Sequence, residues 1–116
     1  MTALPSPLYR IAVVADWAAA RETGAVPWGV VDHRDGFLHL STGPQVLDTA
    51  RLYLAGRKEL LALEIDASML EGEIRFEPSR GGALFPHLYG ALSVAAVTRV
   101  RPLVPTLDGF AFEDAA

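Results

Sequence analysis

The sequence predicts an α+β fold, formed as a single domain over residues 1–116 with its core at residues 8–105. Segments with the length and composition of strands outnumber helical segments, and both predicted helices fall in the first half of the chain. Strands and helices therefore do not alternate as they would in a parallel α/β sheet. The predicted strands cover residues 8–14, 37–40, 60–66, 73–77 and 95–104.

The first predicted helix begins at Trp17, directly after Asp16, and ends at Gly24. Aspartate is a favoured N-terminal cap, and glycine readily adopts the left-handed conformation that ends many helices. Residues 25–35 read as a loop that closes with an Asp-Gly turn.

The second predicted helix follows Ser41 or Thr42, either of which can cap it, and carries Pro44 in its first turn. Gly56 is expected to close it. Apolar residues recur at helical spacing between these points, and they give the helix one apolar face: Val46, Leu47, Ala50, Tyr53 and Leu54.

Alternation assigns faces to the later strands. Leu61, Leu63 and Ile65 share one face of the strand at 60–66. In the strand at 73–77, isoleucine and phenylalanine point inward, and the charged residues, Glu73 and Glu77 among them, point outward as solvated charges. The tail from Thr106 onward is expected to fray.

Composition excludes several classes of function. The chain has no cysteine, so it forms no disulfide, thiolate zinc site or cysteine nucleophile. The net charge of −4 and the scattered arginines argue against a nucleic-acid partner, because phosphate contacts need clustered lysines and arginines. No apolar run is long enough to span a membrane. The N-terminus lacks the pattern of a secretory signal, and we therefore expect a cytoplasmic protein.

Two stretches carry the residues suited to chemistry. Asp35–Thr42 and Phe85–Gly90 each place a histidine among apolar residues, and we expect the two stretches to meet at one pocket. His39 and His87 are the candidate catalytic residues, as acid–base or ligand-orienting groups. The hydroxyl-bearing residues Ser41 and Thr42 lie next to the first histidine.

Other residues are predicted to bind a ligand around the histidines. Gln45 lies one turn into the second helix, and Tyr89 shares a side with His87 in extended geometry. Arg75 and Arg80 offer the planar fork that matches phosphate. The histidines show no metal-ligand spacing, and no metal site is predicted. The alternative interpretation is structural, with both histidines satisfied by hydrogen bonds inside the fold.

The two histidine stretches, together with the opening Leu8–Ile11, resemble the bacterial family called "domain of unknown function 952" over roughly residues 8–105. The resemblance implies a bent, split β-structure similar to the ADP-ribosyltransferase fold, which clamps NAD in a cleft. By this resemblance His39 would hold a ribose and Tyr89 would stack on nicotinamide. The late strand of such transferases carries a catalytic acid, whereas residues 97–101 offer none.

The missing acid favours ligand binding over ADP-ribosyl transfer. A second relative of that fold, the RNA 2′-phosphotransferase, uses histidine and arginines, a chemistry that His39, His87, Arg75 and Arg80 make conceivable. We therefore expect a pocket for a nucleotide-like or phosphorylated small molecule, with NAD or a related nucleotide among the candidates, and a transferase-like enzyme acting through His39 and His87. The alternative is a non-catalytic binding or interaction module. The ligand and the oligomeric state stay open.

Overall fold

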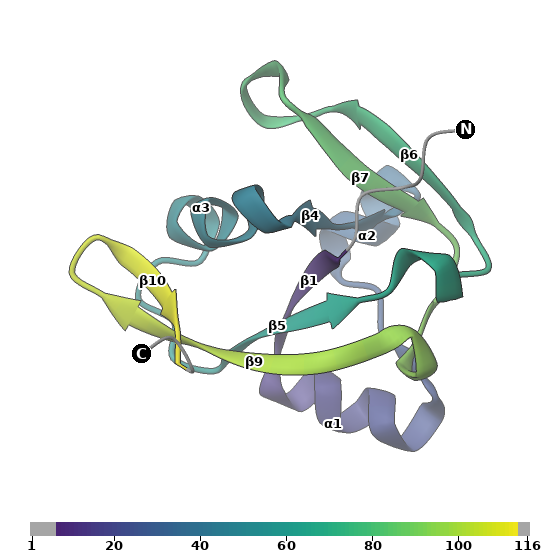
Figure 1. Ribbon diagram of the computed structural model, residues 1–116, viewed down its shortest axis with the longest axis horizontal. Helices are drawn as coiled ribbons and strands as arrows, with labels where there is room; N and C mark the ends of the chain where they lie inside the picture. Colours follow the sequence, from purple (N-terminus) through teal and green to yellow (C-terminus); the bar gives the residue numbers. More distant parts are fainter. Residues whose placement is uncertain (1–6, 114–116) are drawn as a thin grey trace.

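The computed structural model describes residues 7–113, and within them every paired strand is antiparallel (Figure 1). A five-stranded sheet runs in the order β10-β9-β5-β1-β4, and a three-stranded sheet runs in the order β3-β7-β6. The strands of the larger sheet are β1 (Leu8–Val13), β4 (Ser41–Thr42), β5 (Leu60–Ile65), β9 (Val97–Thr106) and β10 (Gly109–Phe112). Those of the smaller sheet are β3 (Leu38–His39), β6 (Glu73–Pro78) and β7 (Leu84–Tyr89).

The rest of the fold consists of helices, 3₁₀ turns and one short strand pair. The α-helices are α1 (Val14–Thr23), α2 (Val30–Asp35) and α3 (Gly43–Tyr53), and β2 (Ala25–Val26) pairs with β8 (Leu92–Ser93). Single 3₁₀ turns lie at η1 (Ala67–Met69), η2 (Arg80–Gly82) and η3 (Val94–Ala96). The α+β class is confirmed. Within residues 7–113 no helix has the length and apolar character needed to cross a membrane.

The larger sheet is buried on both faces, and strand β5 shows why. Its alternation sends Leu61, Leu63 and Ile65 into one apolar cluster, as predicted, whereas Leu60 and Ala62 enter a second cluster on the other face. The first cluster also holds Ala20 of α1 and Leu38 and Leu88 of the smaller sheet. The second holds Val46 and Ala50 of α3. The smaller sheet and α1 thus lie over one face and α3 over the other.

The first helix begins earlier than predicted. Strand β1 passes directly into α1 at Val14, and the cap position is Val13 rather than Asp16, which lies in the first turn. A carboxylate there is still favourable because the amide groups of a helix N-terminus carry partial positive charge. The predicted end is confirmed, since Gly24 has φ 95° and its N–H donates to Ala20 O.

The interpretation of residues 25–35 as a loop was wrong, as was the prediction of two helices. This segment contains the short strand β2 and the helix α2. Six residues are too few to show a helical period. The start of α2 is stabilised locally, because the N–H of its cap residue Gly29 donates to the Asp32 carboxylate. Gly36, at φ 84°, ends the helix.

Helix α3 begins as predicted but ends earlier. Thr42 is its cap, and the Thr42 N–H donates to Oε1 of Gln45 at 3.0 Å. Its last residue is Tyr53, three positions before the glycine expected to close it. Gly56 adopts φ 83° in the turn that follows.

The strand predicted at 37–40 is shorter in the structure, and the chain changes sheets directly after it. Leu38 and His39 pair with β7, whereas Ser41 and Thr42 pair with β1. Between them Leu40 N–H donates to Pro86 O at 3.1 Å. Leucines 38 and 40 are buried in the first core cluster, and His39 points to the opposite side. The chain therefore crosses from one sheet to the other at the histidine stretch.

The prediction of a frayed tail from Thr106 was wrong for the described part of it. Residues 109–112 form β10, which pairs with β9. Phe110 is 8% exposed and packs in the second core cluster with α3. Burial of an aromatic ring on a ready-made apolar surface outweighs the cost of ordering this short hairpin.

Candidate functional site

The two histidines lie directly opposite each other on neighbouring strands. His39 of β3 is in register with His87 of β7, and their ring centroids are 5.6 Å apart. Phe37 packs against both rings, stacking on His87 with a centroid distance of 3.9 Å and an interplanar angle of 21°. The two stretches singled out in the sequence are thus side by side in the fold.

Both histidines line a cleft of about 780 Å³. The cleft lies where the chain passes from β3 to β4, and its walls come from β1, α2, the end of α3 and β7. Its volume is within the range of small-molecule sites. Its lining contains these polar side chains: Arg10, Asp32, Arg34, Asp35, His39, Ser41, Thr49, Tyr53, Arg57, Ser79 and His87.

Asp32 of α2 organises one side of this cleft. Its side chain is 2% exposed and accepts hydrogen bonds from Gly29 N–H, from Nη1 and Nη2 of Arg10, and from both the backbone N–H and Nδ1 of His39. Burial by itself raises the pKa of this carboxyl group. The hydrogen bonds from His39 and Arg10, with the charge of Arg10, overcome that effect and hold the pKa of Asp32 well below its ordinary value.

His39 is held at both ring nitrogens. Nδ1 lies 2.7 Å from Asp32 Oδ1, and Nε2 lies 2.9 Å from Asp35 Oδ2. A carboxylate only accepts hydrogen bonds, so the doubly protonated ring satisfies both contacts. Arg34 also donates to Asp35 and lowers the pKa of that carboxyl group, with a further contribution from His39. The geometry leaves His39 no ring nitrogen directed at a ligand.

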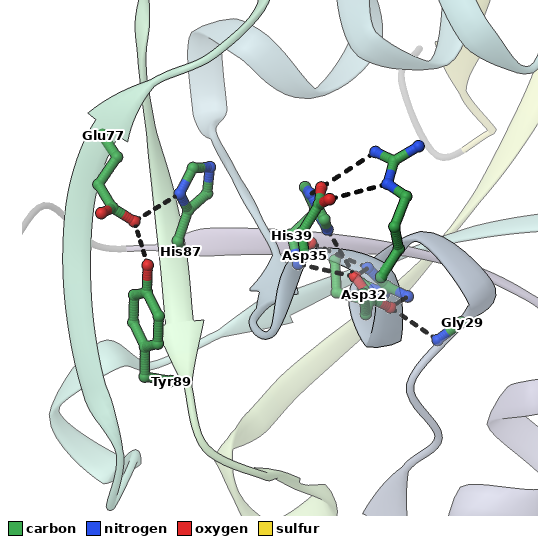
Figure 2. Close-up of polar contacts among 9 residues, drawn as sticks. Gly29, Asp32, Asp35, His39, Glu77, His87 and Tyr89 are labelled. Carbon is green, nitrogen blue, oxygen red and sulfur yellow. Dashed lines mark hydrogen bonds and ion pairs between the residues drawn. The ribbon is translucent and has the colours of Figure 1, made fainter.

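His87 is held at one nitrogen only (Figure 2). Its Nδ1 lies 2.8 Å from Glu77 Oε1, and the same oxygen accepts a hydrogen bond from the Tyr89 hydroxyl at 2.6 Å. These bonds, that of Tyr89 first, lower the pKa of Glu77, and the bond to Glu77 raises the pKa of Tyr89. The His87 side chain is 4% exposed, and its Nε2 is buried with no hydrogen-bond partner among the described residues. Such an orphaned polar atom is rare in a folded protein.

A family model described as "Protein of unknown function (DUF952)" matches residues 11–100. The chain belongs to the DUF952 family. The match spans both histidine stretches, and the family part of the resemblance seen in the sequence is thereby confirmed. Its ADP-ribosyltransferase part stays a prediction.

Solved structures are similar to this DUF952 chain. The crystal structure of protein CC0527 from Caulobacter crescentus is 41% identical with a TM-score of 0.82, covering 90% of this chain and 91% of that one. The solution NMR structure of CC0527 is 41% identical with a TM-score of 0.78, covering 90% of each chain. No curated protein matches the chain.

Only some of the residues predicted to form the site line the cleft of the DUF952 chain. His39, Ser41 and His87 line the cleft, whereas the other described candidates lie outside its lining: Thr42, Gln45, Arg75 and Tyr89. Gln45 bridges α3 to the smaller sheet, donating to Leu84 O at 2.8 Å. Arg75 lies over the Tyr89 ring at 4.6 Å and pairs with Glu73. The side chain of Arg80 lies outside the described part of the chain.

Sequence reasoning missed three residues of this site. Arg10 and Asp32 are far apart in sequence, and only the fold brings them together. Glu77 was read as a solvated charge, and that interpretation was wrong because it binds His87 and Tyr89. One usable signal was present for Glu77. It follows Arg75 on the same face of a strand, and that face had to meet a neighbouring strand.

Proposed function

We propose that the cleft binds a nucleotide-like or phosphorylated small molecule and that His87 contacts it. The observation that supports this most is the orphaned Nε2 of a buried histidine in the cleft wall. A buried polar atom without a partner costs about 1–3 kcal/mol, and a polar group of a ligand would supply the missing hydrogen bond.

The remaining lining suits the parts of such a ligand. Tyr53, 63% exposed at the end of α3, offers an aromatic face to a planar ring, and Val30 adds exposed apolar surface. Arg34 and Arg57 offer guanidinium groups to a phosphate. These arginines pair with acidic neighbours at exposed positions, and such pairs are weak enough for a phosphate to compete.

We also propose that the fold is related to that of ADP-ribosyltransferases, and NAD and its fragments are therefore the first ligands to test. A transferase-like reaction would use His87 as the acid–base group, with His39 fixing the strand beside it. Incubation with NAD and measurement of released nicotinamide tests this part. Release at the background rate would remove the reaction and leave the binding proposal standing.

A thermal-shift screen of nucleotides, NAD fragments and phosphorylated metabolites tests binding. We expect at least one of these compounds to raise the melting temperature of the natural chain and to lose that effect in His87→Leu. His33→Leu is the matched control because His33 lies outside the cleft lining. The proposal fails if no compound shifts the melting temperature, or if His87→Leu responds as the natural chain does.

A second candidate function rests on His39. Its ring is held at both nitrogens by Asp32 and Asp35, an arrangement typical of a structural histidine. This supports a non-catalytic binding or interaction module, in which the histidine stretch fixes the crossing between the two sheets. Equal loss of stability in His39→Leu and His87→Leu, without loss of any ligand, would favour this module.

A further inference from the structure

Glu77 determines where His87 carries its hydrogen. Because the pKa of Glu77 is lowered, its carboxylate is ionised at neutral pH and can only accept hydrogen bonds. Both contacts to its Oε1 must therefore be donated, one by the Tyr89 hydroxyl and one by Nδ1 of His87. The hydrogen of a neutral His87 ring lies on Nδ1.

The other ring nitrogen then has a fixed character. In a neutral imidazole with its hydrogen on Nδ1, Nε2 presents a lone pair and accepts hydrogen bonds. Nε2 of His87 is the atom that lacks a partner among the described residues, and Phe37, stacked on the ring at 3.9 Å, helps to prevent it from rotating. The group that satisfies Nε2 must donate a hydrogen.

We propose that Glu77 is a positioning residue that sets the tautomer of His87 and so restricts the cleft to ligands that place a hydrogen-bond donor against Nε2. The proposal rests on the proposed function, since it states which kind of ligand group, a hydrogen-bond donor, meets Nε2 of His87 in that cleft. Phosphate and carbonyl oxygens, which accept but do not donate, are disfavoured at this point. The sugar hydroxyls and the base amino group of a nucleotide are both donors, and the proposal assigns a sugar hydroxyl to this point.

Tyr89 contacts Glu77 outside the cleft lining, and Arg75 contacts Tyr89. The Tyr89 hydroxyl shares Oε1 of Glu77 with His87, and Arg75 lies over the Tyr89 ring at 4.6 Å. Neither lines the cleft. Removal of the Tyr89 hydroxyl leaves the carboxylate facing Nδ1, so Tyr89→Phe keeps the tautomer and is the matched control for a change at Glu77.

Imidazole ¹⁵N NMR tests the tautomer without any ligand. Spectra are recorded for the natural chain, Glu77→Leu and Tyr89→Phe, at a pH where titration shows the His87 ring to be neutral. We expect the hydrogen on Nδ1 in the natural chain and in Tyr89→Phe, and a mixture of tautomers in Glu77→Leu. Glu77→Gln, which can donate as well as accept, is the second variant if Glu77→Leu does not fold, and it too should give a mixture. A hydrogen on Nε2 in the natural chain, or an unchanged tautomer in both Glu77 variants, overturns the inference.

Isothermal titration with adenosine 5′-monophosphate and its 2′,3′-di-O-methyl analogue tests the ligand polarity. The analogue has lost the sugar donors, and we expect it to bind the natural chain and Tyr89→Phe about tenfold more weakly than the parent nucleotide. In Glu77→Leu that ratio should fall towards one. Equal binding of both compounds to the natural chain overturns the inference and leaves the proposed cleft standing. No binding of the parent nucleotide contradicts the sugar-hydroxyl assignment and counts against the proposed function, while the NMR result still decides the role of Glu77.

Discussion

The two histidines of the cleft sit opposite each other on adjacent strands, yet their surroundings differ in kind. His39 meets a carboxylate at each ring nitrogen, and one of those carboxylates, Asp32, is buried and also bound to Arg10. His87 meets a single carboxylate and keeps one buried nitrogen without a partner among the described residues. The difference teaches that a shared residue type and register do not imply a shared role. The first histidine has both ring nitrogens bound within the fold, and the unbound Nε2 of the second is the reason why we propose it as the ligand contact.

Among the substitutions at these residues, loss of the Asp32 charge should cause the largest loss of stability. Asp32→Asn leaves the guanidinium of Arg10 without its charged partner and turns amide hydrogens toward groups that donate. Breaking a buried ion pair in this way costs about 3–5 kcal/mol of unfolding free energy. Urea denaturation measures the loss, and Asp35→Asn is the control, because Asp35 is exposed and should matter far less. Equal losses in the two variants would contradict the central place given to Asp32.

The stability of the natural chain should fall in acid because of the same carboxylate. The pKa of Asp32 is lower in the folded state than its ordinary value of 3.8, so the unfolded chain binds the proton more readily. The stability that this group contributes is therefore complete above the ordinary value and is lost as the pH falls through the folded pKa. One such group adds a slope of at most about 1.4 kcal/mol per pH unit.

Urea denaturation at a series of pH values below 5 measures that slope. In Asp32→Asn it should be smaller but not zero, because the pKa values of Asp35 and Glu77 are also lowered and change stability in the same direction. A slope that does not change in the variant would show that Asp32 keeps its ordinary pKa in the folded chain.

Matched substitutions at the two histidines sharpen the comparison directly. His39→Leu removes a donor from the buried Asp32 carboxylate, and we expect it to cost about 1–3 kcal/mol of stability. His87→Leu removes the Nδ1 donor to Glu77, but that carboxylate is partly exposed and keeps the hydrogen bond from Tyr89. The substitution also removes the Nε2 atom that lacks a partner among the described residues and keeps an apolar contact with Phe37, so we expect a change of about 1 kcal/mol or less. Equilibrium unfolding of both variants measures the difference. The reverse order would assign the structural role to His87.

Sequence alone could predict the longer strands and helices and the neighbourhood of the histidines. Alternation placed Leu61, Leu63 and Ile65 on one face of β5, and Thr42 was correctly included among the caps of α3. These features follow from local periodicity and cap chemistry, which the sequence displays directly. The opposed directions of Leu38 and His39 follow from the same rule.

The remaining features depend on contacts between distant segments. Helix α2 has too few residues to show a period, and its Asp32 forms an ion pair with Arg10 of β1 and hydrogen bonds with His39 of β3 only because the fold brings these residues to it. Glu77 looked solvated because its strand alternates cleanly, but β7 places a histidine and a tyrosine within its reach. Strand β10 forms because Phe110 finds an apolar surface under α3, which the tail sequence does not contain.

Phe37 offers the finest test, because it touches both histidines. Its ring is nearly parallel to that of His87 with centroids 3.9 Å apart, whereas the His39 ring is 4.6 Å away and tilted by 44°. A double-mutant cycle between Phe37→Leu and His87→Leu should give a coupling energy of about 0.5–1.5 kcal/mol. The cycle with His39→Leu should give less, because carboxylates at both nitrogens hold that ring without help from Phe37. Equal couplings would mean that the three rings pack as one unit, and the division between a fixed and an available histidine would have to be withdrawn.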